Sequence, residues 1–394
     1  MDVLTDAPQN TVLCLNAGSS SLKFALFACG GQTEQELASG SVDHLGSEDA
    51  RATLSVAGRS SQRECARAGP REALDAAFHL LDEQGLPQPT AVGHRVVHGG
   101  QQHTSPARID VALLESLKSI IPLAPLHLPA ALAGIEASLS RSPELPQVAC
   151  FDTAFHANLP PIAAMLPLPE HFYREGIRRY GFHGLSYEYV LSTLGEPPPA
   201  RVIVAHLGNG ASIAAIADGR SIDTTMGLTP GGGIMMGTRS GDLDPGVLLY
   251  LLREQGRSVD DLERLLERES GLLGVAGESD MRRLMQRFEA DPRAELAVNM
   301  MGYQIRKTIG AYIAALGGLD VLVFTGGIGE HTPVIRQAAC RGLEAFGVHL
   351  DLARNTANQR AIHAEGSPCR ILVVETDEDR VIARHTHALV STRA

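Results

Sequence analysis

A short polar segment near the start of the chain carries side chains suited to binding phosphate. The run from Asn16 to Lys23 combines an amide, three consecutive hydroxyl groups and an ammonium group. It lies between two apolar runs, Thr11–Leu15 and Leu22–Ala28, which predict two strands joined by a polar turn. Backbone N–H groups and such side chains at a hairpin tip can meet phosphate oxygens. A serine-rich turn without a ligand is the alternative, because such turns are common.

Two acidic residues stand where a carboxylate could hold a cation. Asp152 follows the predicted strand Gln147–Phe151, and Glu378 opens the predicted C-terminal helix. A carboxylate past a strand end can hold Mg²⁺ or position a phosphoryl acceptor. Helix capping is the alternative for both residues, because Asp-Thr and Thr-Asp-Glu are typical of capped helix N-termini.

Two arginines and one histidine stand in unusual settings. Arg95 lies on the predicted buried strand Ala91–Val97, and Arg239 lies in a glycine-flanked loop. A guanidinium in either place needs an anionic partner, which could be a structural carboxylate or a bound anion. His183 is one of fifteen histidines, most of which should be ordinary core or surface residues, but glycines at 181 and 184 would let the backbone approach a ligand.

Three further segments are rich in glycine or charge. His206–Gly210 closes the predicted strand Val202–Leu207, Gly326–Gly329 follows the predicted strand Val321–Phe324, and Ser279–Arg282 lies between predicted helices. A glycine-rich turn after a strand can approach a nucleotide closely. A loop between a strand and a helix without any ligand is the alternative, because glycine is common there.

The elements that position these residues repeat along the chain. A pattern of three strands followed by alternating helices and strands begins at Thr11 and begins again at Arg201. Such a repeat predicts a duplicated α/β fold with ligands in the cleft between two similar domains. We expect a first domain over 1–155, a second over 156–380, and a helix of about 381–394 returning to the first.

Composition excludes several classes of protein. The chain has 394 residues, 44% hydrophobic and 20% charged, which is enough for two ordinary globular domains. The formal net charge of −11 disfavours nucleic acid as a partner. Six cysteines show no zinc-ligand spacing, and neither a signal peptide nor a membrane span is recognisable. We therefore expect a cytoplasmic protein. The phosphate-binding motifs of P-loop enzymes and protein kinases are also missing.

Several segments, in order, resemble the signatures of the acetate kinase family, and the resemblance covers nearly the whole chain. That family belongs to the superfamily of sugar kinases, 70-kDa heat-shock chaperones and actin, so the resemblance implies duplicated ribonuclease-H-like domains around a nucleotide. The matching segments are Leu15–Phe24, His94–Gly100, Ala124–His127, Phe151–His156, Arg179–Gly184, His206–Gly210, Gly237–Asp242, Phe324–Glu330 and Thr376–Glu378.

The resemblance implies reversible, Mg²⁺-dependent, in-line transfer of the γ-phosphoryl group of ATP to acetate, giving acetyl phosphate and ADP. Propionate or another short-chain carboxylate is the alternative acceptor, because one methylene in an apolar pocket is worth only about 1–3 kcal/mol. A second alternative is a nucleotide-driven ATPase switch of the chaperone or actin type. The family also implies a homodimer formed through the second domain.

The resemblance further implies a role for individual residues. Those at the reacting groups are Asp152, His183 and Arg239. Those that bind the carboxylate substrate are Arg95 and the apolar Val97, Leu126, Phe182 and Pro230. Those that bind ATP or ADP are Lys23, His206, Leu207, Gly208, Asn209, Gly210, Asp280, Met281, Arg282, Gly327, Ile328, Gly329, Glu330 and His331. Those that hold Mg²⁺, with Mn²⁺ as an alternative, are Asn16 and Glu378.

Five residues depart from the family pattern. Leu128 and His331 stand where asparagine is usual, and Met281 stands where an aromatic residue is common. Gly231-Gly232 replaces a usual Leu-Glu pair and creates a triple glycine. Because each glycine adds backbone freedom, we expect the triple glycine to loosen the loop that leads to Arg239.

Overall fold

The computed structural model describes residues 10–18, 20–30 and 33–392. Ser19, in the turn of the polar segment, lies outside the described residues. The chain divides into two compact units, residues 1–155 with 377–394 and residues 156–376. The C-terminal helix therefore belongs to the first unit.

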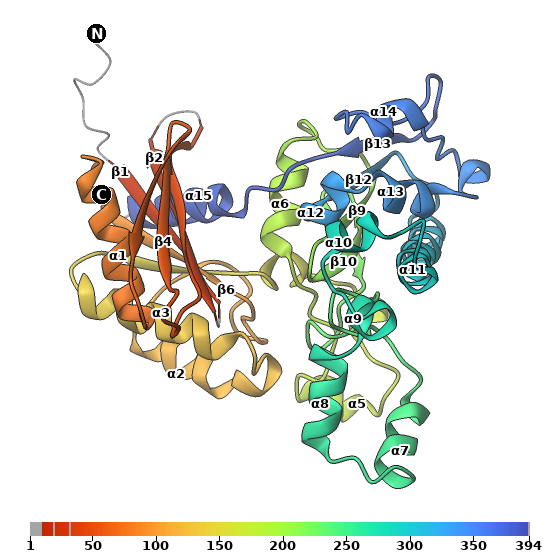
Figure 1. Ribbon diagram of the computed structural model, residues 1–394, viewed down its shortest axis with the longest axis horizontal. Helices are drawn as coiled ribbons and strands as arrows, with labels where there is room; N and C mark the ends of the chain where they lie inside the picture. Colours follow the sequence, from red (N-terminus) through yellow and green to blue (C-terminus); the bar gives the residue numbers. More distant parts are fainter. Residues whose placement is uncertain (1–9, 19, 31–32, 393–394) are drawn as a thin grey trace. The chain divides into compact units, whose positions relative to one another are not determined.

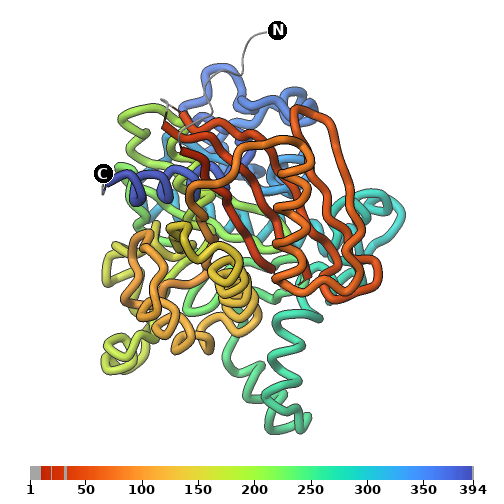
Figure 2. The backbone as a smooth tube through the Cα atoms, turned by 90° about the vertical axis from the view of Figure 1, so that its left-hand side faces the viewer, coloured from red at the N-terminus to blue at the C-terminus, as the bar shows by residue number. Residues whose placement is uncertain are grey.

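Unit 1 is built on an eight-stranded mixed sheet (Figure 1). The strand order is β5-β4-β3-β2-β1-β6-β8-β7, in which β1 to β5 are antiparallel neighbours and β6 and β8 continue parallel to β1. The N-terminal strands run side by side in red and orange in Figure 2. The bounds are β1 Asn10–Ala17, β2 Ser21–Cys29, β3 Gln35–Asp43, β4 Arg51–Val56, β5 Arg59–Glu64, β6 Ala91–Val96, β7 Ala107–Arg108 and β8 Gln147–Phe151.

Helices cover both faces of this sheet. Side chains alternate along β1, so Leu13 and Leu15 pack in one apolar cluster with α1, whereas the Cys14 thiol donates to the backbone carbonyl of Asp379 in α15. The face of Cys14 therefore carries the N-terminal turn of α15. The helices are α1 Pro70–Glu83, α2 Val111–Ser119, η1 Ile121–Leu123, α3 Leu128–Arg141, η2 Ala154–His156 at the unit boundary, and α15 Glu378–Ser391.

Unit 2 is built on a five-stranded sheet of order β11-β10-β9-β12-β13. Figure 1 shows α6 and α11 on either side of it. The strands are β9 Arg201–Leu207, β10 Ala211–Ala217, β11 Arg220–Thr224, β12 Val321–Thr325 and β13 Arg370–Val373. The helices are α4 Pro161–Ala164, α5 Glu170–Arg174, α6 Gly184–Ser192, α7 Pro245–Arg253, α8 Val259–Arg268, α9 Gly271–Ala276, α10 Met281–Gln286, α11 Pro292–Leu316, α12 Gly326–His331, α13 Pro333–Cys340, η3 Glu344–Phe346 and α14 Leu352–Thr356.

The two sheets share one topology, and this confirms the predicted duplicated α/β fold class. In unit 1 the order β3-β2-β1-β6-β8 has three antiparallel strands followed by two parallel ones, and β11-β10-β9-β12-β13 repeats it in unit 2. The β1–β2 turn of unit 1 is therefore equivalent to the β9–β10 turn of unit 2. Both turns belong to the polar or glycine-rich segments singled out from the sequence.

Most predicted elements are found with small shifts, and one expectation was wrong. The predicted strand Gln147–Phe151 is β8, with the same bounds. The glycines after β12 do not form a loop, because Glu330 accepts a hydrogen bond from the backbone N–H of Gly326 and closes a short helix, α12.

No helix in the described part of the chain is long and apolar enough to cross a membrane.

A buried histidine makes the stability of the fold depend on pH. His94 on β6 is 3% exposed, and its Nε2 lies 2.8 Å from Oε1 of Gln147. Burial lowers its pKa to about 4, although the hydrogen bond to Gln147 opposes the shift. Between about pH 6.5 and 4 the unfolded chain therefore binds more protons at this residue than the folded chain, so stability falls as pH falls through this window.

We expect His94 to reduce the free energy of unfolding by about 2 kcal/mol between pH 7 and pH 5. Chemical denaturation at the two pH values measures the total loss, and His94→Gln should make it smaller by about 2 kcal/mol. The buried His156, whose pKa burial also lowers to about 4, keeps its own contribution in this variant. The control His79→Gln changes an exposed histidine on α1 and should keep the loss. Equal pH dependence in both variants would contradict the assignment.

Candidate active site

The polar segment of unit 1 points toward the N-terminal turn of α15. Asn16 and Lys23 are direct partners in the β1–β2 ladder, so their side chains share a face of the sheet. Asn16 lies two residues after Cys14 and therefore shares the face that meets α15. The hairpin thus presents an amide and an ammonium group to the acidic start of that helix.

A charge cluster forms beside these two residues. The guanidinium of Arg95 donates from Nη2 and Nε to the two carboxylate oxygens of Asp152, at 2.6 and 3.0 Å. Its Nε also lies 3.2 Å from Glu378, and its Nη1 donates to Oδ1 of Asn16 at 3.4 Å. One arginine from β6 thus joins the end of β8, the start of α15 and the end of β1.

The cluster carries more negative than positive charge. Burial alone would lower the pKa of the Arg95 guanidinium. The negative charges of Asp152 and then Glu378 outweigh burial and raise this pKa above its usual value. Burial raises the pKa of Asp379 to about 7, and the neighbouring Glu378 and Asp377 add to the shift. The positive charges of Arg95 and Lys23 oppose this rise in the pKa of Asp379 without cancelling it.

The oxygen atoms of this cluster are of the kind that magnesium prefers. Mg²⁺ binds one or two carboxylates completed by water and phosphate oxygens, and Asn16, Asp152 and Glu378 carry amide or carboxylate oxygens. In the described conformation these oxygens contact the guanidinium of Arg95. Among the described residues no three His, Cys, Asp or Glu side chains form a metal-binding group.

In unit 2, two nitrogen donors converge on the β9–β10 turn. A Cβ atom placed on Gly210 would lie 3.5 Å from Nε2 of His183 and 3.7 Å from Nη1 of Arg239. Both side chains therefore reach the turn Gly208–Gly210, which is equivalent to the hairpin tip of unit 1. Paired donors at a glycine turn are suited to an anion such as a phosphoryl group.

His183 is fixed from several sides. It precedes α6 with φ of 58°, in the left-handed region that non-glycine residues seldom occupy. Its ring stacks on that of His206, with centroids 4.3 Å apart, and its Nδ1 lies 2.8 Å from Oγ of Ser212. Strain held in this way is typical of a functional side chain.

Arg239 is paired with a carboxylate that the sequence did not indicate. Its Nε lies 3.1 Å from Glu267, and its Nη1 donates to the carbonyl of Pro230 at 3.2 Å. Burial lowers the pKa of Arg239, and the charge of Glu267 counteracts the shift. Gly231 makes room for this pair, because a Cβ there would lie 2.2 Å from Oε1 of Glu267.

Two of the three consecutive glycines make hydrogen bonds in the described conformation. The N–H of Gly231 donates to Thr229, and the N–H of Gly233 donates to the carboxylate of Asp242 at 2.7 Å. The N–H of Asp242 in turn donates to the carbonyl of Gly233 at 2.7 Å. The expected loosening of this loop stays a prediction.

A cavity of about 640 Å³ lies next to this turn. It brings together residues from three segments that were far apart in the sequence. Of the residues assigned to nucleotide binding, those that line the cavity are Gly208, Asn209, Asp280, Met281, Arg282, Gly327, Ile328 and His331; Ser279, Met285 and Thr332 complete the lining. His206, Leu207, Gly210, Gly329 and Glu330 lie outside the lining, and Lys23 belongs to unit 1.

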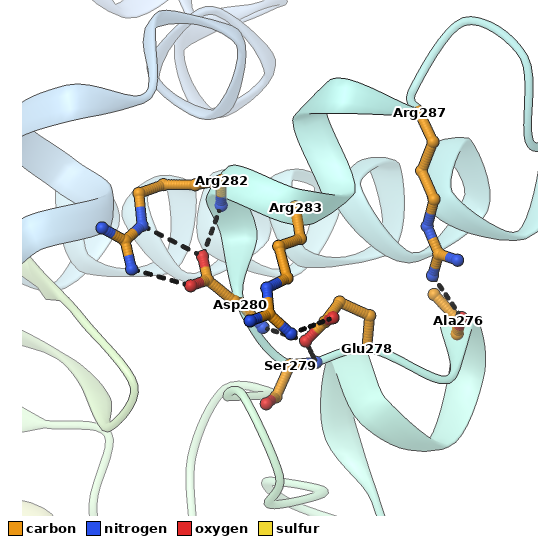
Figure 3. Close-up of polar contacts among 7 residues, drawn as sticks. All are labelled: Ala276, Glu278, Ser279, Asp280, Arg282, Arg283 and Arg287. Carbon is orange, nitrogen blue, oxygen red and sulfur yellow. Dashed lines mark hydrogen bonds and ion pairs between the residues drawn. The ribbon is translucent and has the colours of Figure 1, made fainter.

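One wall of the cavity is stiffened by acidic side chains (Figure 3). Glu278 accepts hydrogen bonds from the backbone N–H groups of Ser279 and Asp280, and Asp280 caps α10 by accepting from the N–H of Arg282. The side-chain hydrogen bond from Arg282 lowers the pKa of Asp280 to about 2, and the backbone N–H adds to the shift. Asp280 is therefore the N-cap of α10, a role that the sequence analysis did not assign to it.

The opposite wall depends on close backbone packing. Gly326 has φ of 76°, and a Cβ there would lie 2.8 Å from the carbonyl oxygen of Leu207, so only glycine fits. The fully buried Arg336 donates to the carbonyls of Gly329 and Glu330, at 2.8 Å each. Glu330 itself is directed at backbone N–H groups, including that of Thr376 at 3.3 Å. These residues hold the shape of α12 below the cavity.

The four apolar residues assigned to the acyl group come from both units. Val97 follows β6 and Leu126 precedes α3 in unit 1, whereas Phe182 and Pro230 belong to unit 2. Phe182 is 1% exposed and Leu128, one of the departures from the family, is fully buried in the cluster of α3 and Phe151. Leu128 is therefore explained as a core residue of unit 1.

Sequence reasoning missed Glu267, Ser212 and Arg336. The need of Arg239 for an anion was visible in the sequence, but Glu267 lies 28 positions away and nothing local marks it. Met285, which lines the cavity, could have been predicted from the sequence, because it lies one helical turn after Met281 and shares its helix face.

Two side-chain nitrogens at a glycine turn beside a cavity are an arrangement suited to phosphoryl compounds, and comparison with known proteins names the family. Residues 11–384 match the model of the acetokinase family. The chain is 44% identical to the acetate kinase of Sulfurovum sp. (strain NBC37-1), over 96% of this chain and 99% of that protein. It therefore belongs to the acetokinase family.

Two solved structures that resemble the chain are a propionate kinase and an acetate kinase. A propionate kinase from Francisella tularensis has a TM-score of 0.91 and 38% identity, covering 96% of this chain and 100% of that one. An acetate kinase from Porphyromonas gingivalis has a TM-score of 0.88 and 38% identity, covering 97% and 100%.

The pairing of Arg239 with Glu267 leads to a stability prediction. Glu267→Gln leaves a mostly buried guanidinium without its counter-charge, and we expect a loss of about 1–2 kcal/mol in the free energy of unfolding. The control Glu269→Gln removes an exposed partner of Arg264 and should cost less than about 0.5 kcal/mol. Chemical denaturation of both variants measures the difference. Equal losses would show that the pair is not stabilising.

Proposed function

We propose that this protein catalyses the reversible, Mg²⁺-dependent transfer of the γ-phosphoryl group of ATP to acetate, giving acetyl phosphate and ADP. The observation that carries the proposal is the convergence of His183 Nε2 and Arg239 Nη1 over Gly210. Two hydrogen-bond donors at that point can stabilise the negative charge on the equatorial oxygens of the phosphoryl group during its transfer. Family membership supplies the carboxyl group as acceptor.

ATP and ADP occupy the cavity of unit 2 in this proposal. The adenosine lies against Asp280–Arg282 on one side and Gly327–His331 on the other, and the phosphates follow the turn from His206 to Gly210. The cavity volume of about 640 Å³ is within the usual range for small-molecule sites. Lys23 contributes its ammonium group to the phosphates from unit 1.

Asn16 and Glu378 hold the metal in this proposal, and Asp152 lies beside them. When bound, Mg²⁺ or Mn²⁺ neutralises phosphate oxygens and keeps the chain of phosphates in line for transfer. Asp152 orients Arg95 through its two-point ion pair and does not need to remove a proton, because a carboxylate acceptor has none to lose. Arg95 can then bind the carboxylate of the substrate in a fixed orientation.

Val97, Leu126, Phe182 and Pro230 contact the methyl group of acetate in this proposal. Propionate is the second candidate acceptor, and the similarity to a propionate kinase structure favours testing it directly. One methylene changes binding by only about 1–3 kcal/mol, so both acids can be substrates with different kcat/KM values.

We also propose a cytoplasmic homodimer formed through unit 2. Leu296, Met300 and Tyr303 on α11 are 54%, 37% and 52% exposed, and their spacing of four and three residues places them in one stripe. A second copy of the chain would cover this stripe in a two-fold interface.

The function is tested by incubating the protein with ATP, Mg²⁺ and acetate, propionate or butyrate, and trapping the acyl phosphate as hydroxamate. We expect product with acetate at the highest kcat/KM. Arg239→Ala should lower kcat by about 10²–10³-fold and leave ATP affinity nearly unchanged. The control Arg264→Ala removes an exposed arginine of α8 and should keep full activity.

Two results would overturn the proposal. One is the absence of hydroxamate with all three acids. The other is ATP hydrolysis whose rate is independent of carboxylate, which would indicate a nucleotide-driven switch instead.

A further inference from the structure

A buried chain of hydroxyl groups lies behind His183. Nδ1 of His183 is 2.8 Å from Oγ of Ser212, and the same oxygen is 2.5 Å from the hydroxyl of Tyr187. Ser212 and Tyr187 are both fully buried. The chain therefore runs from the reacting face of His183 into the interior of unit 2.

The elements of the fold hold this chain rigidly. Tyr187 lies one helical turn after His183 on α6, and its N–H donates to the carbonyl of His183 at 3.1 Å. Ser212 lies on β10 directly opposite His206, whose ring stacks on His183. One strand pair thus supplies both the stacking surface and the hydrogen-bond partner of the imidazole at Nδ1, and Nε2 lies near Gly210.

Either hydroxyl can donate across the contact between Tyr187 and Ser212, and the proposed direction runs from Tyr187 to Ser212. Burial raises the pKa of Tyr187 well above its usual value, so its phenol keeps its proton at physiological pH. When Tyr187 donates to Ser212, the single hydroxyl proton of Ser212 is directed to Nδ1. A neutral imidazole that accepts at Nδ1 carries its own proton on Nε2.

We propose that Ser212 and Tyr187 are positioning residues that fix the tautomer of His183, so that Nε2 presents an N–H group to the transferred phosphoryl group. This inference rests on the proposed function for its catalytic meaning. The opposite tautomer would turn a lone pair toward anionic oxygens and lose a preorganised donor. If the imidazole takes up a second proton, the Ser212 hydroxyl can rotate to accept from Nδ1, and Nε2 stays a donor.

The tautomer can be measured without any activity assay. Long-range ¹⁵N–¹H spectra of histidine-labelled protein distinguish the two neutral forms, and the His183 signals are those that disappear in His183→Gln. We expect the Nε2–H form in the wild type and the Nδ1–H form or a mixture in Ser212→Ala. A wild-type His183 with its proton on Nδ1, or a tautomer unchanged in Ser212→Ala, would overturn the proposal even if the enzyme is an acetate kinase.

Kinetics provide the second measurement. Ser212→Ala and Tyr187→Phe should each lower kcat for acyl phosphate formation by about 10- to 100-fold, with the KM for ATP within about twofold of the wild type. The kcat of the double variant should be about that of the poorer single variant, because Ser212 and Tyr187 both act through the protonation of Nδ1 of His183. Tyr189→Phe on the same helix is the control and should keep full kcat. A rise in KM with kcat unchanged would show a role in nucleotide binding instead.

Discussion

The ion pair between Arg95 and Asp152 is the interaction on which the candidate site of unit 1 depends. Removing a guanidinium from water is costly, and only a partner with matched geometry repays it. Asp152 supplies two oxygens at 2.6 and 3.0 Å, and Glu378 adds a third contact at 3.2 Å. Arg95 lies on β6, Asp152 follows β8 and Glu378 begins α15. The contact between Arg95 and Glu378 therefore also attaches the C-terminal helix to the sheet. Lysine could not make the same two-point contact.

Duplication explains why both units carry a functional turn in the same place. The order of three antiparallel strands and two parallel strands puts the first turn and the parallel strand ends at equivalent positions in each unit. Unit 1 fills these positions with Asn16, Lys23 and the Arg95 cluster, which suit a metal and a carboxylate. Unit 2 fills them with Gly208–Gly210 and α12, which suit close approach of a nucleotide. The same backbone frame therefore carries different side chains in the two units.

The sequence predicted the parts of the fold that local patterns determine. β8 and the strand-turn-strand segment at Asn16–Lys23 follow from apolar runs bounded by turn residues, and the repeat of that pattern predicted two similar sheets. Contacts between distant residues were beyond such patterns. Glu267 meets Arg239 beside Gly231, which is distant in sequence from Glu267, and Ser212 on β10 meets His183 only in the folded unit. The glycines after β12 became a helix because Glu330 caps it from four residues ahead.

The most direct test of the account is a double-mutant cycle on Arg95 and Asp152. The account holds that the two side chains act as one unit in binding and orienting the carboxylate. Arg95→Gln and Asp152→Asn should each lower kcat/KM for acetyl phosphate formation by at least about 100-fold, and the double variant should lose no more than the poorer single variant. Circular dichroism checks that all variants fold. Losses that multiply in the double variant would contradict the claim, because they would show that the two residues act independently.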